Sequence, residues 1–234
     1  MTQFGFARIV LFACLASSVV FFPSVTALAG VVPFTETFTH DSANWRNSPG
    51  LAAVDWVSNG GPDDSAFAST TVNFESLGTG DPAVLFRGQD EFNSSGGAFV
   101  GDWVSSGVSG FSAFVRHDAD VPLNYFVRFA SPNNFPGANN IFFIPVASDT
   151  WTNVSAALPN PNLIFEGPFS YAQVFGNIGH IQIGVSVPAS FAGTDTPVRF
   201  DLDSVSVVPE PATLGLLMAG GAMALRRRGT RRWA

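Results

Sequence analysis

The stretch Ile181-Gln182-Ile183-Gly184-Val185-Ser186-Val187 decides the fold class. Its odd positions are apolar and its even positions are small or polar, which is the alternation of a β-strand with one buried and one solvated face. Similar short segments, rich in Val, Ile, Phe and Thr, recur along the chain between clusters of Gly, Asn, Asp, Ser and Pro. Because no stretch keeps an apolar period of 3.6 residues long enough for a major helix, we expect an all-β domain.

Strands are predicted at residues 32–38, 52–57, 83–86, 98–104, 111–116, 125–130, 141–146, 151–158, 178–187 and 198–207. This number suits a two-sheet antiparallel sandwich. In the last segment Phe200 and Leu202 share one parity, and Val205 and Val207 share the other. Either a β-bulge near Asp203 changes the facing of this strand, or both of its faces are covered. Loops, which often carry binding sites in sandwiches, are predicted at residues 59–64, 93–97 and 131–140.

The N-terminal segment has the pattern of a signal peptide. Arg8 precedes an apolar stretch at residues 9–22, and Ala27-Leu28-Ala29 supplies the small residues that signal peptidase needs at its cleavage site. We therefore place the mature N-terminus at Gly30.

The C-terminal segment has the pattern of a short membrane helix. Val208-Pro209-Glu210-Pro211 leads into an apolar run, residues 212–225, and the basic residues Arg226, Arg227 and Arg228 follow it. The run would span about 21 Å, less than the roughly 30 Å hydrocarbon core of a bilayer, so the helix alone would be a marginal anchor. The arginines should stay in the cytoplasm, which places residues 30–208 on the other side of the membrane.

Pro-Glu-Pro, a short hydrophobic helix and an arginine cluster, in this order, resemble the PEP-CTERM sorting signal of Gram-negative bacteria. The resemblance covers about a tenth of the chain. It implies that an exosortase, a membrane protease or transpeptidase, recognises the tail with Glu210 as the recognition residue, and bearers of this signal often accompany exopolysaccharide production. An ordinary C-terminal membrane anchor is the other interpretation. The predicted organisation is a signal peptide at 1–29, an exported β-sandwich at 30–207 and a sorting signal at 208–234.

The charge and composition of the exported part exclude several functions. Residues 30–208 contain 17 acidic side chains, 5 arginines and no lysine, a formal charge of −12. Such a surface repels phosphate backbones, so nucleic-acid binding is disfavoured. The absence of lysine excludes a Schiff-base lysine, a phosphate-loop lysine and a serine–lysine dyad. The only cysteine, Cys14, lies in the signal segment, so the mature part is neither a disulfide scaffold nor a thiol enzyme.

A second resemblance extends over most of residues 32–207. Four segments carry it: Thr35-Glu36-Thr37-Phe38 followed by Trp45, Gly110-Phe111-Ser112-Ala113-Phe114-Val115-Arg116, Trp151-Thr152-Asn153-Val154-Ser155, and Leu202-Asp203-Ser204-Val205-Ser206-Val207. Their order is similar to that of jelly-roll carbohydrate-binding or galactose-binding-like domains. The resemblance implies a structural calcium between the closing strand and the first strand, with Asp203 and Glu36 as its carboxylate ligands. These acidic residues could equally be solvated residues that protect a sheet edge.

Carbohydrate recognition would need aromatic platforms beside hydrogen-bonding side chains. Trp56 and Trp103 are the candidates for ligand binding, because acidic, Asn or Ser residues lie next to them in the sequence. The alternative is that each tryptophan packs in the core. Trp151 is the one for which we most expect a core position.

No local sequence pattern indicates catalysis, and we expect no enzyme. The histidines His40, His117 and His180 are not spaced as His-Glu-x-x-His, and no Gly-x-Ser-x-Gly segment occurs. His117 with Asp118 and Asp120 is interpreted as a surface turn. Glycosidases need only two carboxylates, which can be distant in sequence, so Asp90-Glu91 and Glu166 keep a hydrolase open as a third reading.

The sequence therefore predicts a non-enzymatic exported protein of the cell envelope or extracellular matrix. Its precursor would lie in the inner membrane and periplasm, with signal peptidase and an exosortase as its partners during export, and the mature domain would reach the cell surface or matrix. The alternative is a carbohydrate-binding module for the exopolysaccharide of the host.

Overall fold

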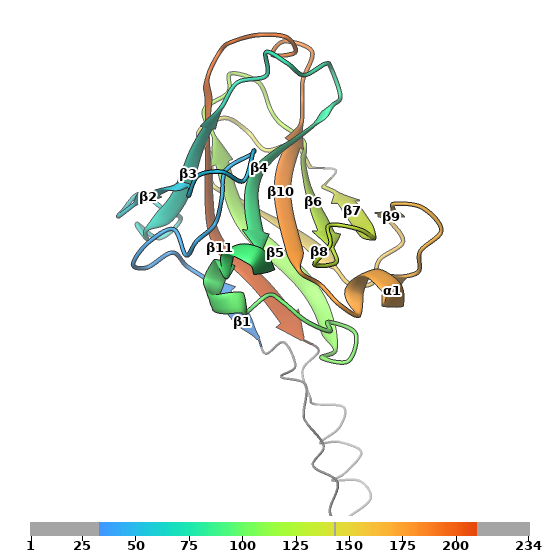
Figure 1. Ribbon diagram of the computed structural model, residues 1–234. Helices are drawn as coiled ribbons and strands as arrows, with labels where there is room; N and C mark the ends of the chain where they lie inside the picture. The colour runs from blue at the N-terminus through green and yellow to red at the C-terminus, as the bar shows by residue number, and fades with distance from the viewer. Residues whose placement is uncertain (1–32, 143, 210–234) are drawn as a thin grey trace, which may run out of the picture.

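The computed structural model describes residues 33–142 and 144–209. They form two antiparallel β-sheets that face each other across one hydrophobic core (Figure 1). The strands are β1 (Phe34–Glu36), β2 (Asp55–Val57), β3 (Phe67–Val72), β4 (Pro82–Gln89), β5 (Val108–His117), β6 (Tyr125–Ala130), β7 (Gly137–Ile141), β8 (Thr152–Ala157), β9 (Leu163–Phe165), β10 (His180–Ser186) and β11 (Val198–Pro209). The helical segments are η1 (Asp90–Phe92), η2 (Ser94–Gly97) and α1 (Tyr171–Phe175). The prediction of an all-β antiparallel sandwich is confirmed.

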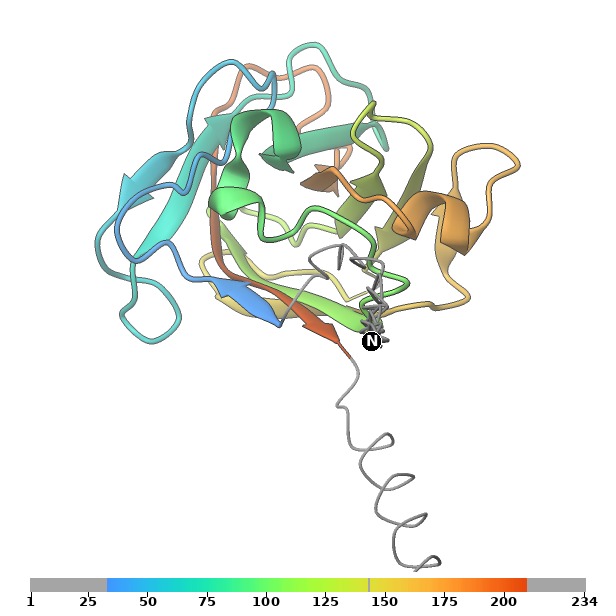
Figure 2. The same cartoon turned by 60° about the horizontal axis from the view of Figure 1, so that its bottom comes forward.

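The two sheets differ in size. The six-stranded sheet has the order β2-β3-β11-β5-β8, and β1 is also paired with β11. The five-stranded sheet has the order β4-β10-β6-β7-β9. Figure 2 shows the two layers nearly end-on. The last described strand, β11, pairs with β3 and β1 along one side and with β5 along the other. It therefore joins strands from early and middle parts of the chain in one sheet.

Aromatic side chains fill much of the core. The ring of Phe129 in β6 lies 5.3 Å from those of Phe111 and Trp103 and 5.2 Å from that of Phe175, measured between ring centroids. All four side chains are buried. Burial of a side chain of this size contributes about 1.5–3 kcal/mol. Trp103 and Phe175 come from segments outside the strands, so the connections close the core where the sheets do not.

A β-bulge changes the facing of β11. Its register with β5 shifts between Asp203 and Ser206, and Ser204 has a φ of 50°. Leu202 is buried before the shift and Val205 after it, so apolar residues of opposite parity enter the same core. Of the two interpretations of this segment, a β-bulge near Asp203 or coverage of both faces, the β-bulge is observed.

Several predicted strand positions are wrong. Residues 98–104 form turns, and only Gly101 makes an isolated bridge, to Ile178. β7 lies inside the predicted loop at 131–140 and ends where a strand was predicted to start, because pairing with β6 and β9 on both sides outweighs the low strand propensity of its asparagines. The strands β3 and β9 were not predicted.

The predicted terminal segments lie outside the described residues. These are the signal peptide, its cleavage site at Ala27, Ala29 and Gly30, the apolar run at 212–225 and the arginines that follow it. The described chain ends with Pro209, which pairs with Val108 of β5. Among residues 33–142 and 144–209, no helix is long and apolar enough to cross a membrane.

Candidate functional site

The outward face of the five-stranded sheet is polar along its middle. Residues 181, 183 and 185 of β10 point into the core, so the alternate residues of this strand face outward. Gln182 of β10 lies opposite Arg87 of β4 and opposite Arg128 of β6. Arg128 in turn lies opposite Asn139 of β7, and Asn139 opposite Ile164 of β9. A polar row thus crosses β4, β10, β6 and β7, and it ends against the apolar Ile164 of β9.

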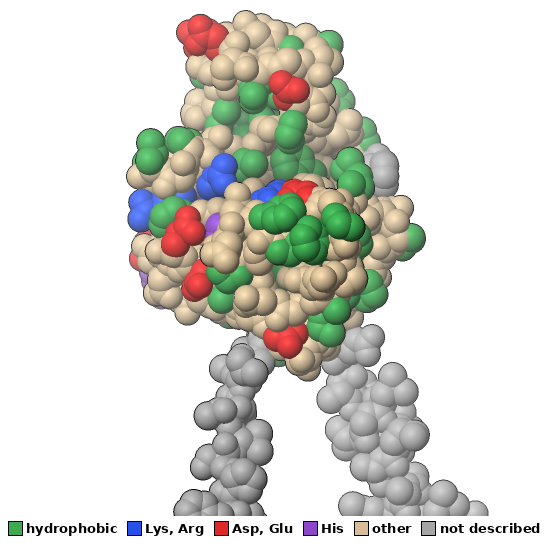
Figure 3. Space-filling view, turned by 45° about the vertical axis from the view of Figure 1, so that its right-hand side comes forward, with side chains coloured by type: hydrophobic (Ala, Val, Ile, Leu, Met, Phe, Trp, Pro, Cys, Tyr) green, Lys and Arg blue, Asp and Glu red, His purple; other side chains and the backbone are tan. Residues whose placement is uncertain are grey.

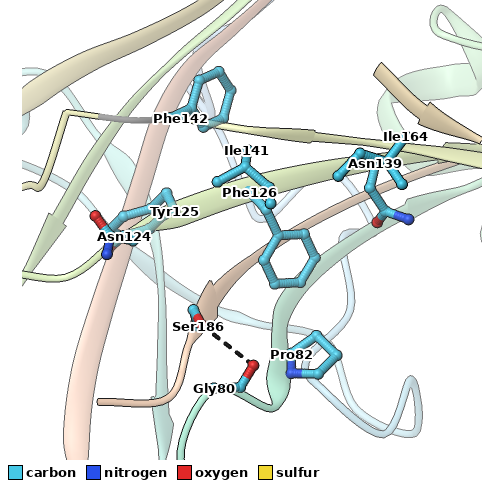
Figure 4. A pocket seen from close by; sticks show the side chains of 10 residues that line it. All are labelled: Gly80, Pro82, Asn124, Tyr125, Phe126, Asn139, Ile141, Phe142, Ile164 and Ser186. Atoms are coloured by element: carbon cyan, nitrogen blue, oxygen red, sulfur yellow. Dashed lines mark hydrogen bonds between the residues drawn. The ribbon is translucent and has the colours of Figure 1, made fainter. Parts of the chain in front are cut away.

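One end of this face is an apolar pocket of about 530 Å³ (Figure 4). Its lining is formed by Gly80, Pro82, Asn124, Tyr125, Phe126, Asn139, Ile141, Phe142, Ile164 and Ser186. None of these side chains is charged. The hydroxyl of Ser186 donates to the carbonyl of Gly80 at 3.3 Å, which leaves the amides of Asn124 and Asn139 as the polar side chains that can contact a ligand there.

The ring of Phe126 points into the middle of the pocket, as Figure 4 shows. It occupies the space above Gly184 of β10, where a Cβ would lie only 2.5 Å from the ring. The carbonyl oxygen of Ala83 in β4 is nearer still, so the glycine in β10 makes room both for this backbone and for the aromatic floor. An apolar floor with amide groups at its edge suits a ligand that has both apolar and hydrogen-bonding faces.

The other end of this face is a polar pocket of about 400 Å³ beside His180. The Nε2 of His180 lies 3.1 Å from the carbonyl of Pro132, and its Nδ1 lies 3.1 Å from the side-chain nitrogen of Gln89. Because a carbonyl only accepts, Nε2 carries the proton and Nδ1 accepts from Gln89. Burial lowers the pKa of His180, and Glu91, 3.4 Å away, opposes this only in part. His180 is therefore neutral at neutral pH.

An ion pair between Arg128 and Glu166 joins the two pockets. Arg128 donates to both carboxylate oxygens of Glu166, with Nε at 2.5 Å and Nη2 at 2.7 Å, and to the side-chain oxygen of Asn134 at 2.6 Å. These donors from Arg128 lower the pKa of Glu166. The pair lies over Gly137, where a Cβ would come within 2.6 Å of the Glu166 carboxylate. The network covers Gln182, which is why this residue is buried although the sequence places it on a solvated face.

Two phenylalanines form an aromatic rim beside the ion pair. Phe135 is 54% exposed, and its ring lies 5.1 Å from that of Phe169 in an edge-to-face contact. The backbone carbonyl of Asn134 accepts from Arg128 at 2.7 Å, so the arginine fixes the segment that carries Phe135. Figure 3 shows acidic and basic side chains next to each other beside a hydrophobic patch on this side of the molecule. We call the apolar pocket, the polar pocket and this rim together the outer-face groove.

The groove follows β10 from Ser186 to His180, a strand of seven residues that spans about 20 Å. Its central carboxylate and arginine neutralise each other, and the lowered pKa of Glu166 keeps this group ionised and unable to act as a proton donor at neutral pH. The arrangement therefore suits binding of an uncharged, extended and polar ligand. One signal of the groove is present in the sequence: Arg128 is the only charged residue in the otherwise mostly apolar segment 125–130, which indicates that its side chain faces outward.

The two tryptophans proposed for ligand binding, Trp103 and Trp56, differ in exposure and in position. Trp103 is fully buried, and its indole nitrogen donates to the carbonyl of Phe99 at 2.8 Å, so the prediction that it contacts a ligand is wrong. The ring of Trp103 packs against that of Phe129 in the core. The polar residues next to Trp103 in the sequence do not predict the direction of its ring. Trp56 is 42% exposed, but it lies in β2 of the other sheet and donates to the carbonyl of Phe38.

Trp151, expected in the core, is only half-buried. It lies on the six-stranded sheet, where the guanidinium of Arg116 stacks 4.6 Å from its ring and 5.1 Å from that of Phe67. Arg116 donates to the buried carboxylate of Asp201 at 2.8 Å, which also accepts from Ser69 at 2.7 Å. These bonds hold the arginine and its aromatic neighbours as a structural unit on the face opposite the groove.

Glu36 and Asp203 lie on the paired strands β1 and β11, where Glu36 is opposite Val205, two positions after Asp203. Asp203 is 1% exposed; its burial, and to a lesser degree the charge of Glu36, raise its pKa. It accepts from the hydroxyl of Ser65 at 2.7 Å, and among the described residues neither carboxylate forms an ion pair. A buried carboxylate that has no basic side chain as a partner would be stabilised by Ca²⁺, and a second carboxylate nearby could supply a further ligand. The described part of the chain offers no third His, Cys, Asp or Glu at this place, so backbone oxygens and water would complete the set.

The residues considered for catalysis are not brought together. His117 is fully buried at the end of β5, with Nε2 3.0 Å from the carbonyl of Val146, so its interpretation as a surface residue is wrong. Asp118 is exposed and accepts from the backbone nitrogen of Arg199. Glu166 is paired with Arg128 and Glu91 lies beside His180, so among the described residues these candidate carboxylates for a glycosidase have different partners.

The end of β11 matches a known motif. The family description "PEP-CTERM protein-sorting motif" fits residues 207–232. The match confirms the resemblance drawn from Pro-Glu-Pro and the arginines, implies processing by an exosortase, and indicates an exported protein. The motif begins at Val207, which is fully buried in β11.

Solved structures with similar folds include proteins that act on or bind polysaccharides. An exo-beta-agarase has a TM-score of 0.51 at 11% identity, over 75% of this chain and 24% of that one. The CBM22-1-GH10 modules of Clostridium thermocellum endo-1,4-beta-D-xylanase 10B have a TM-score of 0.46 at 16% identity, over 76% and 28% of the two chains. The CBM22-1 xylan-binding domain of Paenibacillus barcinonensis Xyn10C has a TM-score of 0.44 at 14% identity, over 78% and 98%.

At these identities the similarity shows the fold alone. The chain spans only about a quarter of the length of the agarase and the xylanase. No similar sequence was found among curated proteins. The neighbours are mostly carbohydrate-binding modules of jelly-roll type, and no catalytic domain is shown for this chain.

Proposed function

We propose that this protein is an exported, non-enzymatic envelope or matrix protein that binds a polysaccharide of its own host through the outer-face groove. The observation that carries the proposal is the groove itself: an apolar pocket and a polar pocket on one sheet face, with an ion pair between them and the exposed ring of Phe135 at the border. Sugar rings present apolar C–H faces and polar hydroxyl edges, which is the combination that this lining offers.

The ordered side chains favour binding of an extended chain. Arg128 is held by Glu166 and Asn134, and Asn139 donates to Glu166 at 3.1 Å, so the polar groups at the centre are fixed before a ligand arrives. Pre-organised groups lose little conformational entropy on binding. The rim residue Phe135 is exposed and can stack on a sugar face.

The sorting tail supplies the route to the envelope. In this proposal signal peptidase cleaves before Gly30, the apolar run at 212–225 holds the precursor in the inner membrane, and the arginines after it stay in the cytoplasm. The exosortase then recognises Pro209, Glu210 and Pro211, and the domain reaches the cell surface or matrix. This order of events agrees with the matched motif, which implies exosortase processing.

The test is calorimetry of the protein purified from host cells with exopolysaccharide extracted from the same host. We expect saturable binding that weakens at least tenfold in the variants Phe135→Ala, at the rim, and Asn139→Ala, at the centre. Trp56→Ala changes an aromatic residue of similar exposure on the other sheet and should bind normally.

The other possible results would indicate a different binding site or a different function. Loss of binding in Trp56→Ala with normal binding in Phe135→Ala would place the ligand on the six-stranded sheet. Absence of binding, with a cooperative melt that verifies the fold, would reject polysaccharide recognition and leave a structural role at the cell surface. Release of reducing sugar from the polysaccharide would instead identify a hydrolase.

A further inference from the structure

The strand β8 (Thr152–Ala157) is an outer strand of the six-stranded sheet, paired with β5 on one side only. Edge strands usually carry charges, prolines or bulges that prevent pairing with other chains. The sequence of β8, Thr-Asn-Val-Ser-Ala-Ala, contains no charge and no proline, and its register with β5 runs from Val115 to Gly110 without a shift. β8 therefore lacks these protections; within the described part of the chain, only at its end does the side chain of Asn160 donate to a backbone carbonyl, that of Ala157, at 2.7 Å.

The other edges of the described sheets are shorter or protected. β2 and β9 have three residues each, and β2 begins with an exposed aspartate. β4 begins with a proline and is covered in part by the bridge between Arg46 and Arg87. β8 has six residues, which give an edge of about 20 Å.

A groove of about 550 Å³ runs along this edge. Every residue of β8 lines it, and Ile141, Ile144, Asn160 and Asn162 form much of its other wall. Ile144 is 76% exposed and Ile141 39%, so apolar surface faces the space that an added strand would occupy. All residues that line this groove are uncharged.

We propose that β8 is a self-association edge, at which the β8 strands of two copies of this chain pair antiparallel. Residues 30–208 carry a formal charge of −12 in each copy, so two copies repel one another over most of this part, and association is least opposed where no charged side chain lines the contact. A two-fold pair is self-complementary, because each strand offers the other the same backbone donors and acceptors. The second copy's strand would also cover Ile144. The groove beside β8 shares Ile141 and Phe142 with the apolar pocket of the outer-face groove, but no residue of β8 lines that pocket.

The experiment is sedimentation velocity of the protein purified from host cells, over a wide range of concentrations, with three chains compared. In Ser155→Lys a lysine replaces an exposed side chain of β8, and both copies would carry it at the shared edge. Thr71→Lys adds the same charge at an exposed position of β3, away from the edge.

We expect the unchanged chain and Thr71→Lys to form dimers with the same dissociation constant, and Ser155→Lys to raise that constant at least tenfold. If Ser155→Lys does not give a cooperative melt, Asn153→Lys, also at an exposed β8 position, takes its place. A chain that is monomeric at every concentration overturns the proposal. So does equal dimerisation of all three chains, or equal loss in both lysine variants. Calorimetry with the polysaccharide tests the groove separately, so failure of one proposal leaves the other in place.

Discussion

Replacing Glu166 by glutamine tests the ion pair at the centre of the groove. The change Glu166→Gln keeps the size of the side chain and removes the charge that accepts two bonds from Arg128. Hydrogen bonds to charged groups contribute about 1.5–3 kcal/mol, and both side chains are mostly covered, with relative exposures of 14% for Arg128 and 28% for Glu166. We expect the free energy of unfolding to fall by about 2 kcal/mol, which lowers the melting temperature by about 4–8 °C for a domain of this size.

The pH dependence identifies the cause of this loss. Arg128 lowers the pKa of Glu166 in the folded protein. A lowered carboxyl pKa stabilises the fold fully above the unfolded value of about 4.3, and the stabilisation is lost as the pH falls through the folded value. The difference in stability between the unchanged chain and Glu166→Gln should therefore be full at neutral pH and disappear in acid below the lowered pKa.

The assay is urea unfolding followed by fluorescence at neutral and acidic pH, with Glu75→Gln as the matched control. Glu75 is exposed in the loop after β3, so the same substitution there should change stability by less than about 0.5 kcal/mol. Equal stability of Glu166→Gln and the unchanged chain at neutral pH would refute the role of the pair. A loss that is the same at both pH values would show that packing, and not charge, is responsible.

Three further predictions concern the floor of the groove, the calcium site proposed at Glu36 and Asp203, and the tail. Gly184→Ala would drive a Cβ against the carbonyl oxygen of Ala83 and the ring of Phe126, and should reduce the free energy of unfolding by about 1–3 kcal/mol, measured with urea. Calcium at a hundred times its dissociation constant should stabilise the protein by about 2.7 kcal/mol, and Asp203→Asn should abolish this shift in calorimetric melts; an equal shift in the variant would place any calcium elsewhere. Replacing Pro209, Glu210 and Pro211 by alanine should leave the precursor unprocessed in the membrane fraction of immunoblots, and normal processing would reject their role as the signal.

The fold class could be predicted because strand alternation is a local signal. β6 (Tyr125–Ala130) has the predicted bounds, and β10 lies within its predicted segment. β3 (Phe67–Val72) was missed because small and polar residues make up most of its sequence, and its pairing with β2 and β11 is set by contacts far away in the chain. Local propensity could not supply those contacts.

The groove could not be predicted as a site because its parts are distant in sequence. Arg128 and Glu166 are 38 positions apart, and Gln89 and His180 are 91 apart, yet each pair is in contact. Only the register between strands brings them to one face. The prediction that Trp103 binds a ligand was wrong for a related reason. Polar neighbours in the sequence do not show whether a side chain is exposed, and Trp103 is buried by residues distant in the sequence.

The boundary between the sandwich and the sorting motif is a last consequence of the topology. The motif starts at Val207, whose side chain is fully buried and whose backbone pairs with Phe34 of β1 and Phe111 of β5. A chain that ends after Pro209 keeps this residue and should melt like the unchanged protein. A chain that ends after Ser206 loses the buried valine, which alone contributes about 1.5–3 kcal/mol, together with its ladder pairing. Equal melting temperatures for the two truncated chains would mean that the end of β11 contributes no stability, and that the motif lies outside the cooperative fold.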